Sequence, residues 1–441
     1  MESFAALPPA NPTLSHRQRL RYILSGSAGN LVEYFDWAIY AAFALYFAPL
    51  FFPEGDQTAQ LLNNAAVFAV GFVFRPLGGW LLGSLADRKG RKSALLLSVS
   101  LMCLGSLIIA CAPAYAEIGN WAPALLLFAR MLQGFSIGGE YGSSATYLSE
   151  MAGAKHRGYY SSFQYVTIVL GQLLALGLLM LLQRYLLSSE QLHAWGWRIP
   201  FVVGGTLAVL ALWLRGNMAE TSAFANSRQH PGRRAALREL ARHPRAVFTV
   251  VTLTAGGTVS YYTFTVYMQK FLVNTSGFSK DDATLICSLG LLGFMALQPI
   301  FGLISDYVGR RTLLIGFGIG ATVCTAPLLS LLAQARSVET ALAWYLCALL
   351  ITSGYSSVNA IVKAELFPVH IRALGVGFPY ALTVALFGGS TEYLALWLKS
   401  QGHPDWFGYY VSGCAALALC VAVTMKEPLR DSALDRDEPA A

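Results

Sequence analysis

A short charged turn between two apolar runs decides how the rest of the sequence is interpreted: Gly83-Ser84-Leu85-Ala86-Asp87-Arg88-Lys89-Gly90-Arg91-Lys92. The pattern recurs as Gly302-Leu303-Ile304-Ser305-Asp306-Tyr307-Val308-Gly309-Arg310-Arg311, with Asp and Arg at the same interval in both copies. Repetition of a motif within one chain is typical of duplicated folds. The sequence therefore predicts two copies of one structural unit joined end to end.

The composition is that of a membrane protein. Of the 441 residues, 55% are hydrophobic and 12% are charged, and the mean hydropathy is +0.50, which is too apolar for a soluble globular chain. The net charge of +7 comes from Lys and Arg that gather on one side of the apolar runs, as the positive-inside rule describes. The seven cysteines lack the spacing of metal ligands or a disulfide framework. We therefore expect a lipid bilayer around the chain and no nucleic acid, metal or cofactor.

Twelve apolar runs are long enough to span a membrane, for which a helix needs roughly 20 residues. They cover residues 22–50, 60–83, 93–113, 121–148, 158–187 and 196–215 in the first half, and residues 246–273, 283–304, 312–333, 340–362, 372–398 and 405–425 in the second. The prediction is an all-α integral membrane protein whose twelve transmembrane helices form two pseudo-symmetric six-helix bundles.

The domain organisation follows from these runs. We expect an N-terminal segment at 1–21, a six-helix bundle at 22–215, a basic linker at 216–245, a second bundle at 246–425 and a tail at 426–441. An even number of spans leaves both termini on one side, and the basic turns put that side in the cytoplasm. The tail is short and mixed in charge, so we expect it to be disordered.

The charged turns and two helix ends are predicted to form a cytoplasmic gate. The spacing from Glu150 to Arg157, at the end of the fourth run, matches that from Glu365 to Arg372, at the end of the tenth. There, Glu and Arg can pair with the charged turn of neighbouring helices. The predicted gate residues are Asp87, Arg91, Glu150, Arg157, Asp306, Arg310, Glu365 and Arg372.

Ionisable side chains inside spanning helices are costly, about 2.5 to 3.5 kcal/mol each on insertion scales, and therefore mark candidate sites. The first run has the densest set, because Asn30, Glu33, Asp36 and Tyr40 recur at intervals that share one helix face. Asp36 lies near the middle of its run. We interpret it as functional, since a carboxylate is a costly way to fasten two helices.

Two arginines add permanent positive charge near mid-membrane. Arg75 precedes Pro76 in the second run, and Arg130 opens the stretch Arg130-Met131-Leu132-Gln133-Gly134 in the fourth. Arginine suits bidentate binding of a carboxylate in a low-dielectric cavity. Two arginines suit a dianion, whereas a neutral sugar would leave both in need of other partners.

Other polar side chains are predicted to line the same site. Gln164 and Gln172 share one face of the fifth run, and a tyrosine-rich stretch that ends at Lys270 follows in the seventh. The predicted substrate-binding residues are Arg75, Arg130, Asn30, Tyr34, Gln164, Gln172, Tyr261, Tyr262 and Lys270. Asn359, Tyr380 and Glu392 are weaker candidates, because each could serve packing alone.

The charged turn resembles the signature loop between the second and third helices of the major facilitator superfamily, with its weaker echo between the eighth and ninth. Other stretches resemble the metabolite:proton symporters within it: Gly29-Asn30-Leu31-Val32-Glu33-Tyr34-Phe35-Asp36, Phe74-Arg75-Pro76-Leu77-Gly78-Gly79, Gly138-Gly139-Glu140-Tyr141-Gly142, Trp195-Gly196-Trp197-Arg198-Ile199-Pro200 and Lys363-Ala364-Glu365-Leu366-Phe367-Pro368. Within that family, Phe163-Gln164-Tyr165-Val166-Thr167 and Tyr262-Thr263-Phe264-Thr265 look most like the members that carry alpha-ketoglutarate. Arg88-Lys89-Gly90-Arg91 departs from their loop without changing the class.

The resemblance implies a proton-coupled symporter of the bacterial inner membrane that works as a monomer. In proton-coupled facilitators the arginine of Arg-x-x-Gln-Gly partners a first-helix acid, so by resemblance Asp36 and Arg130 are the coupling pair, with Glu33 as a further proton carrier. The hypothesis is that deprotonated Asp36 holds Arg130 until a proton frees it to bind the substrate together with Arg75. The expected cargo is a small anionic metabolite, a dicarboxylate such as alpha-ketoglutarate.

Several alternatives stay open. Citrate, shikimate or a zwitterion such as proline or betaine could replace the dicarboxylate, although the zwitterion symporters tend to carry a long helical C-terminal tail. A drug/proton antiporter would need an apolar cavity with few fixed cations, and a transporter-like sensor would need an added signalling domain. An enzyme is not expected, because no nucleophile with its base and no metal cluster can be assembled from these runs.

Overall fold

The computed structural model describes residues 16–53, 56–89, 91–138, 141, 145, 149, 156–216, 238–368, 371–429 and 432; the side chains of 16–29, 83–96, 210–216 and 373 lie outside that description. Every regular element in these ranges is helical. Eight helical segments among them are long and apolar enough to cross a membrane, by length and composition. This confirms the predicted fold class.

The first half contains the long helices α1 (His16–Phe51), α2 (Gln57–Lys89), α3 (Arg91–Cys111), α5 (Trp121–Ile137), α8 (Phe163–Leu181) and α10 (Ile199–Gly216). Short elements join them: α4 (Tyr115–Ile118), α7 (Arg157–Ser161), η2 (Leu182–Leu186), α9 (Ser189–Ala194) and η3 (Gly196–Arg198). Each of the six runs predicted in this half coincides with helix in the described residues.

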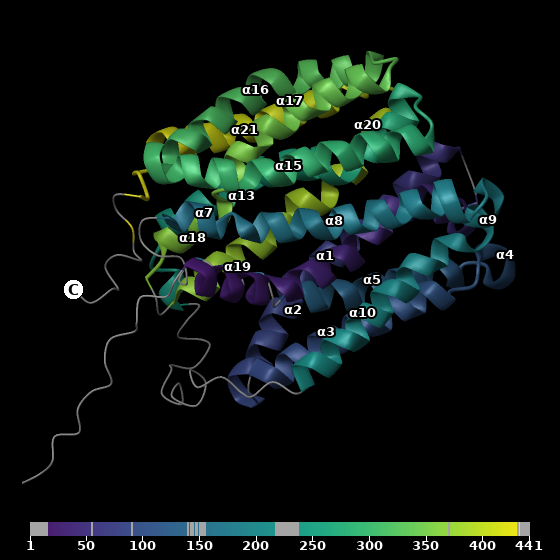
Figure 1. The fold of residues 1–441 in the computed structure, drawn as a ribbon, viewed down its shortest axis with the longest axis horizontal. Helices are drawn as coiled ribbons and strands as arrows, with labels where there is room; N and C mark the ends of the chain where they lie inside the picture. The colour runs from purple at the N-terminus through teal and green to yellow at the C-terminus, as the bar shows by residue number, and fades with distance from the viewer. Residues whose placement is uncertain are drawn as a thin grey trace, which may run out of the picture.

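The second half repeats the arrangement. Its elements are α13 (Pro244–Tyr262), η4 (Thr263–Tyr267), α14 (Met268–Phe271), η5 (Leu272–Ser276), α15 (Lys280–Val308), α16 (Arg310–Gln334), α17 (Val338–Ser356), α18 (Asn359–Leu366), α19 (Arg372–Thr383), η7 (Val384–Gly388), α20 (Gly389–Ser400) and α21 (Asp405–Thr424). In Figure 1 the green and yellow helices of this half lie mostly above the purple to teal helices of the first.

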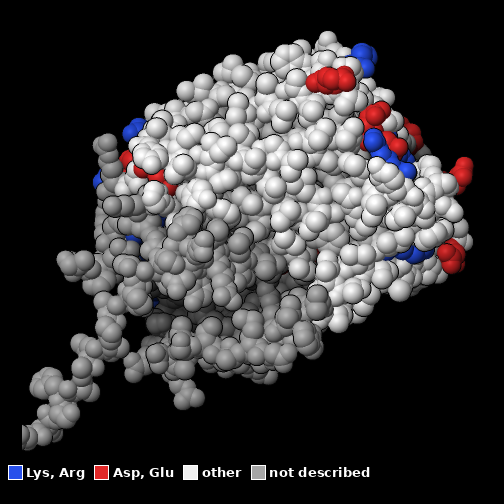
Figure 2. All heavy atoms as spheres, in the orientation of Figure 1, with Lys and Arg blue, Asp and Glu red and all other residues white. Residues whose placement is uncertain are grey.

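The outer face of the helices is suited to lipid. Large apolar side chains are exposed along the long helices, among them Phe128, Leu174, Val323, Leu386 and Leu417. Figure 2 shows Lys, Arg, Asp and Glu side chains gathered toward the two ends of the described surface, with uncharged residues over the face between them. A broad apolar band between charged ends is the pattern expected of a membrane-embedded bundle.

The two halves meet along two pairs of helices. α8 of the first half packs on α15 of the second, and α2 packs on α20 and η7. Where α7 meets α15 the approach requires glycine: a Cβ at Gly158 of α7 would lie 2.5 Å from the backbone oxygen of Gly302 in α15. Both pairs of helices surround the polar residues described below.

The seventh span widens where the tyrosines lie. α13 passes into a π-helical turn, η4, directly after Tyr261 and Tyr262. The Tyr345 hydroxyl donates to the Phe264 carbonyl within this turn at 2.7 Å, which satisfies a backbone group that the wider turn leaves free. Single π-helical turns inside α-helices are frequent at functional sites. The turn redirects the seventh span beside the interface between the halves.

The beginning of the C-terminal tail is ordered, contrary to the prediction of disorder. The Glu427 carboxylate accepts hydrogen bonds from the backbone N–H groups of Arg310 at 2.9 Å and Arg311 at 3.1 Å. These groups open helix α16, where free N–H donors and the helix dipole attract an anion. Charge mixture in the sequence did not reveal this capping contact. Residues 433–441 lie outside the described ranges.

Candidate functional site

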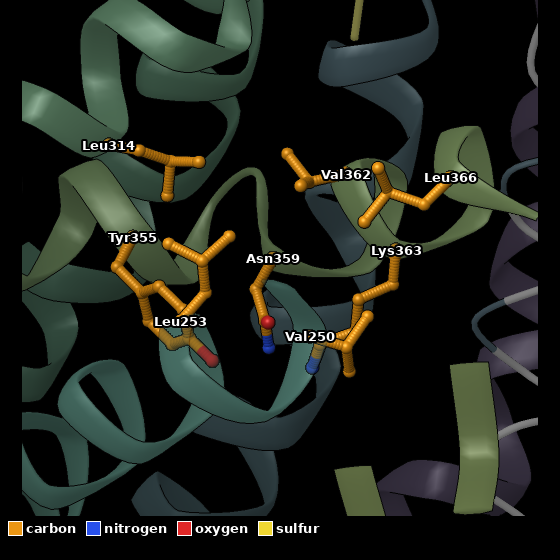
Figure 3. Close-up of a pocket in the computed structure, with 8 residues that line it drawn as sticks. All are labelled: Val250, Leu253, Leu314, Tyr355, Asn359, Val362, Lys363 and Leu366. Atoms are coloured by element: carbon orange, nitrogen blue, oxygen red, sulfur yellow. The ribbon is translucent and has the colours of Figure 1, made fainter. Parts of the chain in front are cut away.

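Three cavities, called outer, middle and inner below, lie among the described helices, and residues of both halves line the outer and middle ones. The outer cavity, of about 310 Å³, lies beside Leu45, Gln57, His193 and Lys280. The middle one is lined by Trp37 and Gln172 of the first half and by Thr265, Gln269 and Leu291 of the second. The inner one is lined by second-half residues, including Tyr355, Asn359 and Lys363 (Figure 3).

Arg75 lies beside Trp37, which lines the middle cavity, and has unused hydrogen-bond donors. Its guanidinium stacks over the rings of Phe72 at 4.0 Å and Trp37 at 4.2 Å. It is buried, and its Nε and Nη2 atoms have no hydrogen-bond partner. Phe72 contacts Tyr262 of the second half, with ring centroids 5.2 Å apart. A buried guanidinium with free donors at the interface can receive an anionic ligand.

Arg130 is enclosed by aromatic rings of the first half. Its guanidinium lies 3.7 Å from the Trp37 ring centroid and 4.3 Å from that of Tyr40. Its Nη1 donates to Gln133 Oε1 at 2.6 Å, while Nε and Nη2 lack hydrogen-bond partners. The ring of Trp37 therefore lies against both arginines and couples their positions.

Asp36 faces away from Arg130, toward the interior of the first bundle. Its carboxylate accepts hydrogen bonds from Ser106 Oγ and from Gln133 Nε2, the latter at 2.7 Å. A Cβ at Gly204 of α10 would lie 2.8 Å from Asp36 Oδ1, so this helix closes over the carboxylate. The direct Asp36–Arg130 pair expected from the sequence is not formed, because the Gln133 amide lies between the two charges.

Amides and tyrosine hydroxyls connect the halves at the same depth. Gln172 Nε2 donates to the Tyr261 hydroxyl at 3.1 Å. Asn359 Nδ2 donates to the hydroxyl of Tyr165 at 2.7 Å and to that of Tyr141 at 3.3 Å. Both donors cross from one half to the other. Neutral hydrogen bonds of this kind can be exchanged for substrate contacts at modest cost.

The other predicted site residues are buried, but one of them is bound within its own half. Asn30 is buried with both amide atoms unpartnered, and Glu33, Tyr34 and Gln164 are buried as well. Lys270 forms a buried ion pair with Glu392 at 2.5 Å inside the second bundle. Its charge is therefore neutralised within its own half, which argues against the predicted contact with substrate.

The sequence analysis did not identify three residues of the candidate site. Ser106 has no pattern signal, because a serine in an apolar run is ordinarily a packing residue. Gln133 stood in the quoted Arg-x-x-Gln-Gly motif, and its spacing of three residues from Arg130 could have suggested the contact. Lys363 stood in a quoted motif too, and a lysine inside a predicted span is itself a site signal.

Three of the predicted second-half gate residues, Asp306, Arg310 and Glu365, form one cluster. Arg310 pairs with Asp306 at 2.9 Å and approaches Glu365 at 3.6 Å. Asp306 also accepts from the backbone N–H groups of Gly158 at 2.8 Å and Tyr159 at 3.0 Å, across the interface. Two further predicted gate residues, Arg157 and Arg372, are also buried. The side chains of Asp87, Arg91 and Glu150 lie outside the described residues.

The outer end is closed by a second contact between the halves. Lys280, at the start of α15, donates to the backbone oxygen of Leu45 at 3.1 Å and lies 2.7 Å from His193 Nε2. Contacts between the halves are thus found in two regions of the described bundles, at Lys280 and at Asp306. No group of three or more His, Cys, Asp or Glu in the described part of the chain could hold a metal ion.

Comparison with known proteins identifies relatives over most of the chain. The family described as "Sugar (and other) transporter" matches residues 23–236 and again residues 215–428. The chain is 50% identical to the alpha-ketoglutarate permease of Escherichia coli (strain K12), covering 93% of this chain and 94% of the relative. It is 34% identical to a citrate-proton symporter of Salmonella typhi over 94% and 95% of the two chains. The proline/betaine transporter of Escherichia coli (strain K12) is 32% identical over 92% and 83%.

Solved structures show the same fold. A D-xylose-proton symporter superposes with a TM-score of 0.72 at 20% identity, covering 92% of this chain and 96% of the other. An inward-open structure of the xylose transporter XylE from E. coli gives a TM-score of 0.66 at 19% identity. At this identity the likeness extends to the arrangement of helices and not to the ligand.

Proposed function

Since the chain belongs to the sugar (and other) transporter family of membrane carriers, we propose that it takes up alpha-ketoglutarate together with protons by alternating access. The observation that carries the proposal is Arg75, a buried guanidinium at the interface with two unpartnered nitrogens. The 50% identity to an alpha-ketoglutarate permease agrees with this chemistry. A carboxylate would satisfy the free donors, whereas a sugar hydroxyl would leave the charge without a counter-ion.

Proton coupling runs through Gln133 rather than through a direct ion pair. The Gln133 amide donates to Asp36 through Nε2 and accepts from Arg130 through Oε1. A proton on Asp36 removes part of the charge that holds the amide in this orientation. Gln133 then turns, and Arg130 gains the freedom to move toward the substrate with Arg75. Proton uptake at one side chain is thereby linked to anion binding at another.

Charge arithmetic sets the number of protons. Moving one net charge across the membrane costs or yields about 2.3 kcal/mol per 100 mV. A dianion that enters with one proton moves against an inside-negative potential, so two or more protons are expected. Asp36 carries one in this proposal, and the buried Glu33 on the same helix carries another.

The charged cluster around Arg310 serves as the cytoplasmic latch. Asp306 accepts from the backbone of Gly158 in the opposite half, so release of this contact accompanies inward opening. By the internal duplication, Asp87, Arg91, Glu150 and Arg157 serve the same role on the first-half side, with Glu365 and Arg372 on the second. In this proposal both termini and the linker are cytoplasmic, the bundles have the boundaries given above, and a monomer is sufficient.

Uptake of labelled alpha-ketoglutarate into proteoliposomes tests the proposal. With an inward pH gradient we expect accumulation that a protonophore abolishes and that unlabelled C5 dicarboxylates inhibit more than citrate, shikimate or proline. Accumulation of one of these competitors, with no uptake of alpha-ketoglutarate, would assign the carrier to another substrate. Uptake that ignores both the protonophore and the pH gradient would contradict proton coupling.

A further inference from the structure

Lys363 is a buried cation that the mechanism above leaves unused. It lies on α18 with 2% of its surface exposed, and its Nζ atom has no hydrogen-bond partner. The ammonium lies 3.8 Å from the ring centroid of Tyr380 and 5.6 Å from that of Tyr141. Figure 3 shows Lys363 and Asn359 extending from α18 to the same side of the inner cavity.

Other buried cations of the second half have hydrogen-bonding or charged partners. Lys270 pairs with Glu392, and Arg310 pairs with Asp306. Arg372 donates to the carbonyl oxygens of Ala364 and Phe367 at 3.2 and 3.1 Å. An ammonium without hydrogen bonds or a counter-ion is costly to bury, and contact with aromatic rings offsets only part of that cost. Among the described residues, Lys363 has no carboxylate within ion-pair distance.

A line of contacts leads from Arg75 to Lys363. Phe72, under the Arg75 guanidinium, contacts Tyr262, and from there ring contacts continue through Tyr261 to Tyr165. Asn359 donates to the hydroxyls of Tyr165 and Tyr141. Tyr141 stacks on Tyr380 with ring centroids 3.8 Å apart, and the Lys363 ammonium lies over the Tyr380 ring. Two buried cations, one from each half of the carrier, thus flank one tyrosine-lined region. Each presents unpartnered nitrogen atoms.

We propose that Arg75 and Lys363 bind the two carboxylates of a dicarboxylate substrate, one from each half. This rests on the proposed function: Arg130, once free, joins Arg75 at the carboxylate held by the first half, and Lys363 supplies the cation of the second half. The inner cavity is small in this structure, so the carboxylate displaces the tyrosine contacts as the halves rearrange. A substrate held at both ends ties the two bundles together, whereas a monocarboxylate satisfies only one cation.

The assignment predicts a specific loss of selectivity. In purified wild-type protein we expect alpha-ketoglutarate to bind at least tenfold more tightly than 2-oxopentanoate, which has the same carbon chain and a single carboxylate. In Lys363→Met the affinity for alpha-ketoglutarate falls roughly 10- to 100-fold, as expected for one charged hydrogen bond, while that for 2-oxopentanoate stays within threefold. Lys363→Arg keeps the preference for the dianion.

Control variants distinguish a failure of the role proposed for Lys363 from a failure of the proposed function. Lys426→Met removes an exposed cation outside the site and should change neither affinity. Lys363→Gln repeats the test should the methionine variant fail to fold as judged by gel filtration. A neutral variant that keeps the wild-type preference overturns the role of Lys363 without touching the proposed function, as does a loss of preference in Lys363→Arg. A wild-type protein that binds no dicarboxylate overturns the proposed function itself.

Discussion

Arg130 and Asp36 are joined through the two ends of one amide and make no direct contact. The Gln133 oxygen accepts from Arg130 at 2.6 Å, and the Gln133 nitrogen donates to Asp36 at 2.7 Å. An amide can satisfy a cation and an anion at the same time only in this orientation. A change in the charge of Asp36 therefore acts directly on Gln133, the residue that also bonds Arg130.

Replacement of Gln133 should uncouple the two charges. Gln133→Leu removes the hydrogen bonds to Arg130, Asp36 and Ser106 at similar volume, so we expect pH-driven accumulation in proteoliposomes to be lost while substrate exchange at equal pH stays within about threefold of wild type. Gln298→Leu is the matched control, because Gln298 is a buried glutamine bonded only within the second half. Normal accumulation by Gln133→Leu would show that the amide does not transmit the proton signal.

Asp36→Asn should abolish concentrative uptake in the same assay. The asparagine keeps the shape of the side chain but carries no charge and takes up no proton, so the carrier is fixed in a state that resembles the protonated one. Exchange of internal for external substrate needs no net proton movement and should persist. If accumulation in this variant still follows the imposed pH gradient, the proton is carried elsewhere.

The Lys270–Glu392 pair should matter for stability more than for substrate. Glu392→Gln leaves a buried ammonium without its counter-ion, which costs about 3 to 5 kcal/mol and should lower the thermal midpoint in detergent. The double variant Lys270→Met/Glu392→Leu removes both charges and should recover most of that loss. Its affinity for alpha-ketoglutarate should equal that of wild type; a tenfold loss would restore Lys270 to the substrate site.

The sequence was sufficient for the fold because the periodic signals are strong. Twelve apolar runs, a repeated charged turn and the asymmetry of Lys and Arg each depend on local composition, and the helices follow them closely. The candidate site was only partly predictable. Arg75 and Arg130 stand out as charges in apolar runs, but which partner each one contacts depends on the rotation of its helix. Ser106 and Lys363 come close to other site residues only through packing between helices distant in sequence.

Two expectations, a disordered tail and a direct Asp36–Arg130 pair, were wrong because the deciding contacts come from residues distant in sequence or from an intervening side chain. Glu427 lies in a segment whose composition suggests disorder. Its carboxylate nevertheless caps α16, because the backbone N–H of Arg310 at the start of that helix lies within hydrogen-bond distance. Asp36 and Arg130 were expected to pair because Arg-x-x-Gln-Gly resembles the motif of proton-coupled facilitators. Instead, the Gln133 amide lies between them and forms a hydrogen bond with each charge. The spacing of residues in the sequence does not reveal this arrangement.

Bulk at Gly158 should prevent closure of the cytoplasmic side. A Cβ there would lie 2.2 Å from Ser305 Oγ and 2.5 Å from the Gly302 oxygen, both in the opposite half. Gly158→Val therefore forces α7 away from α15 and weakens the Gly158–Asp306 hydrogen bond. Because the outward-facing state needs this contact, we expect uptake to fall roughly tenfold or more, with the inward-open population enriched.

Alkylation of a cysteine in the same interface measures that population. Ser162 faces Gly302, so Ser162→Cys, in a background with the seven native cysteines replaced, should react faster with a maleimide when Gly158→Val is present. Gly177→Val is the control, because a Cβ at Gly177 meets no atom within 4 Å. Wild-type uptake and unchanged labelling in Gly158→Val would mean that the α7–α15 contact is not the element that closes the carrier toward the cytoplasm.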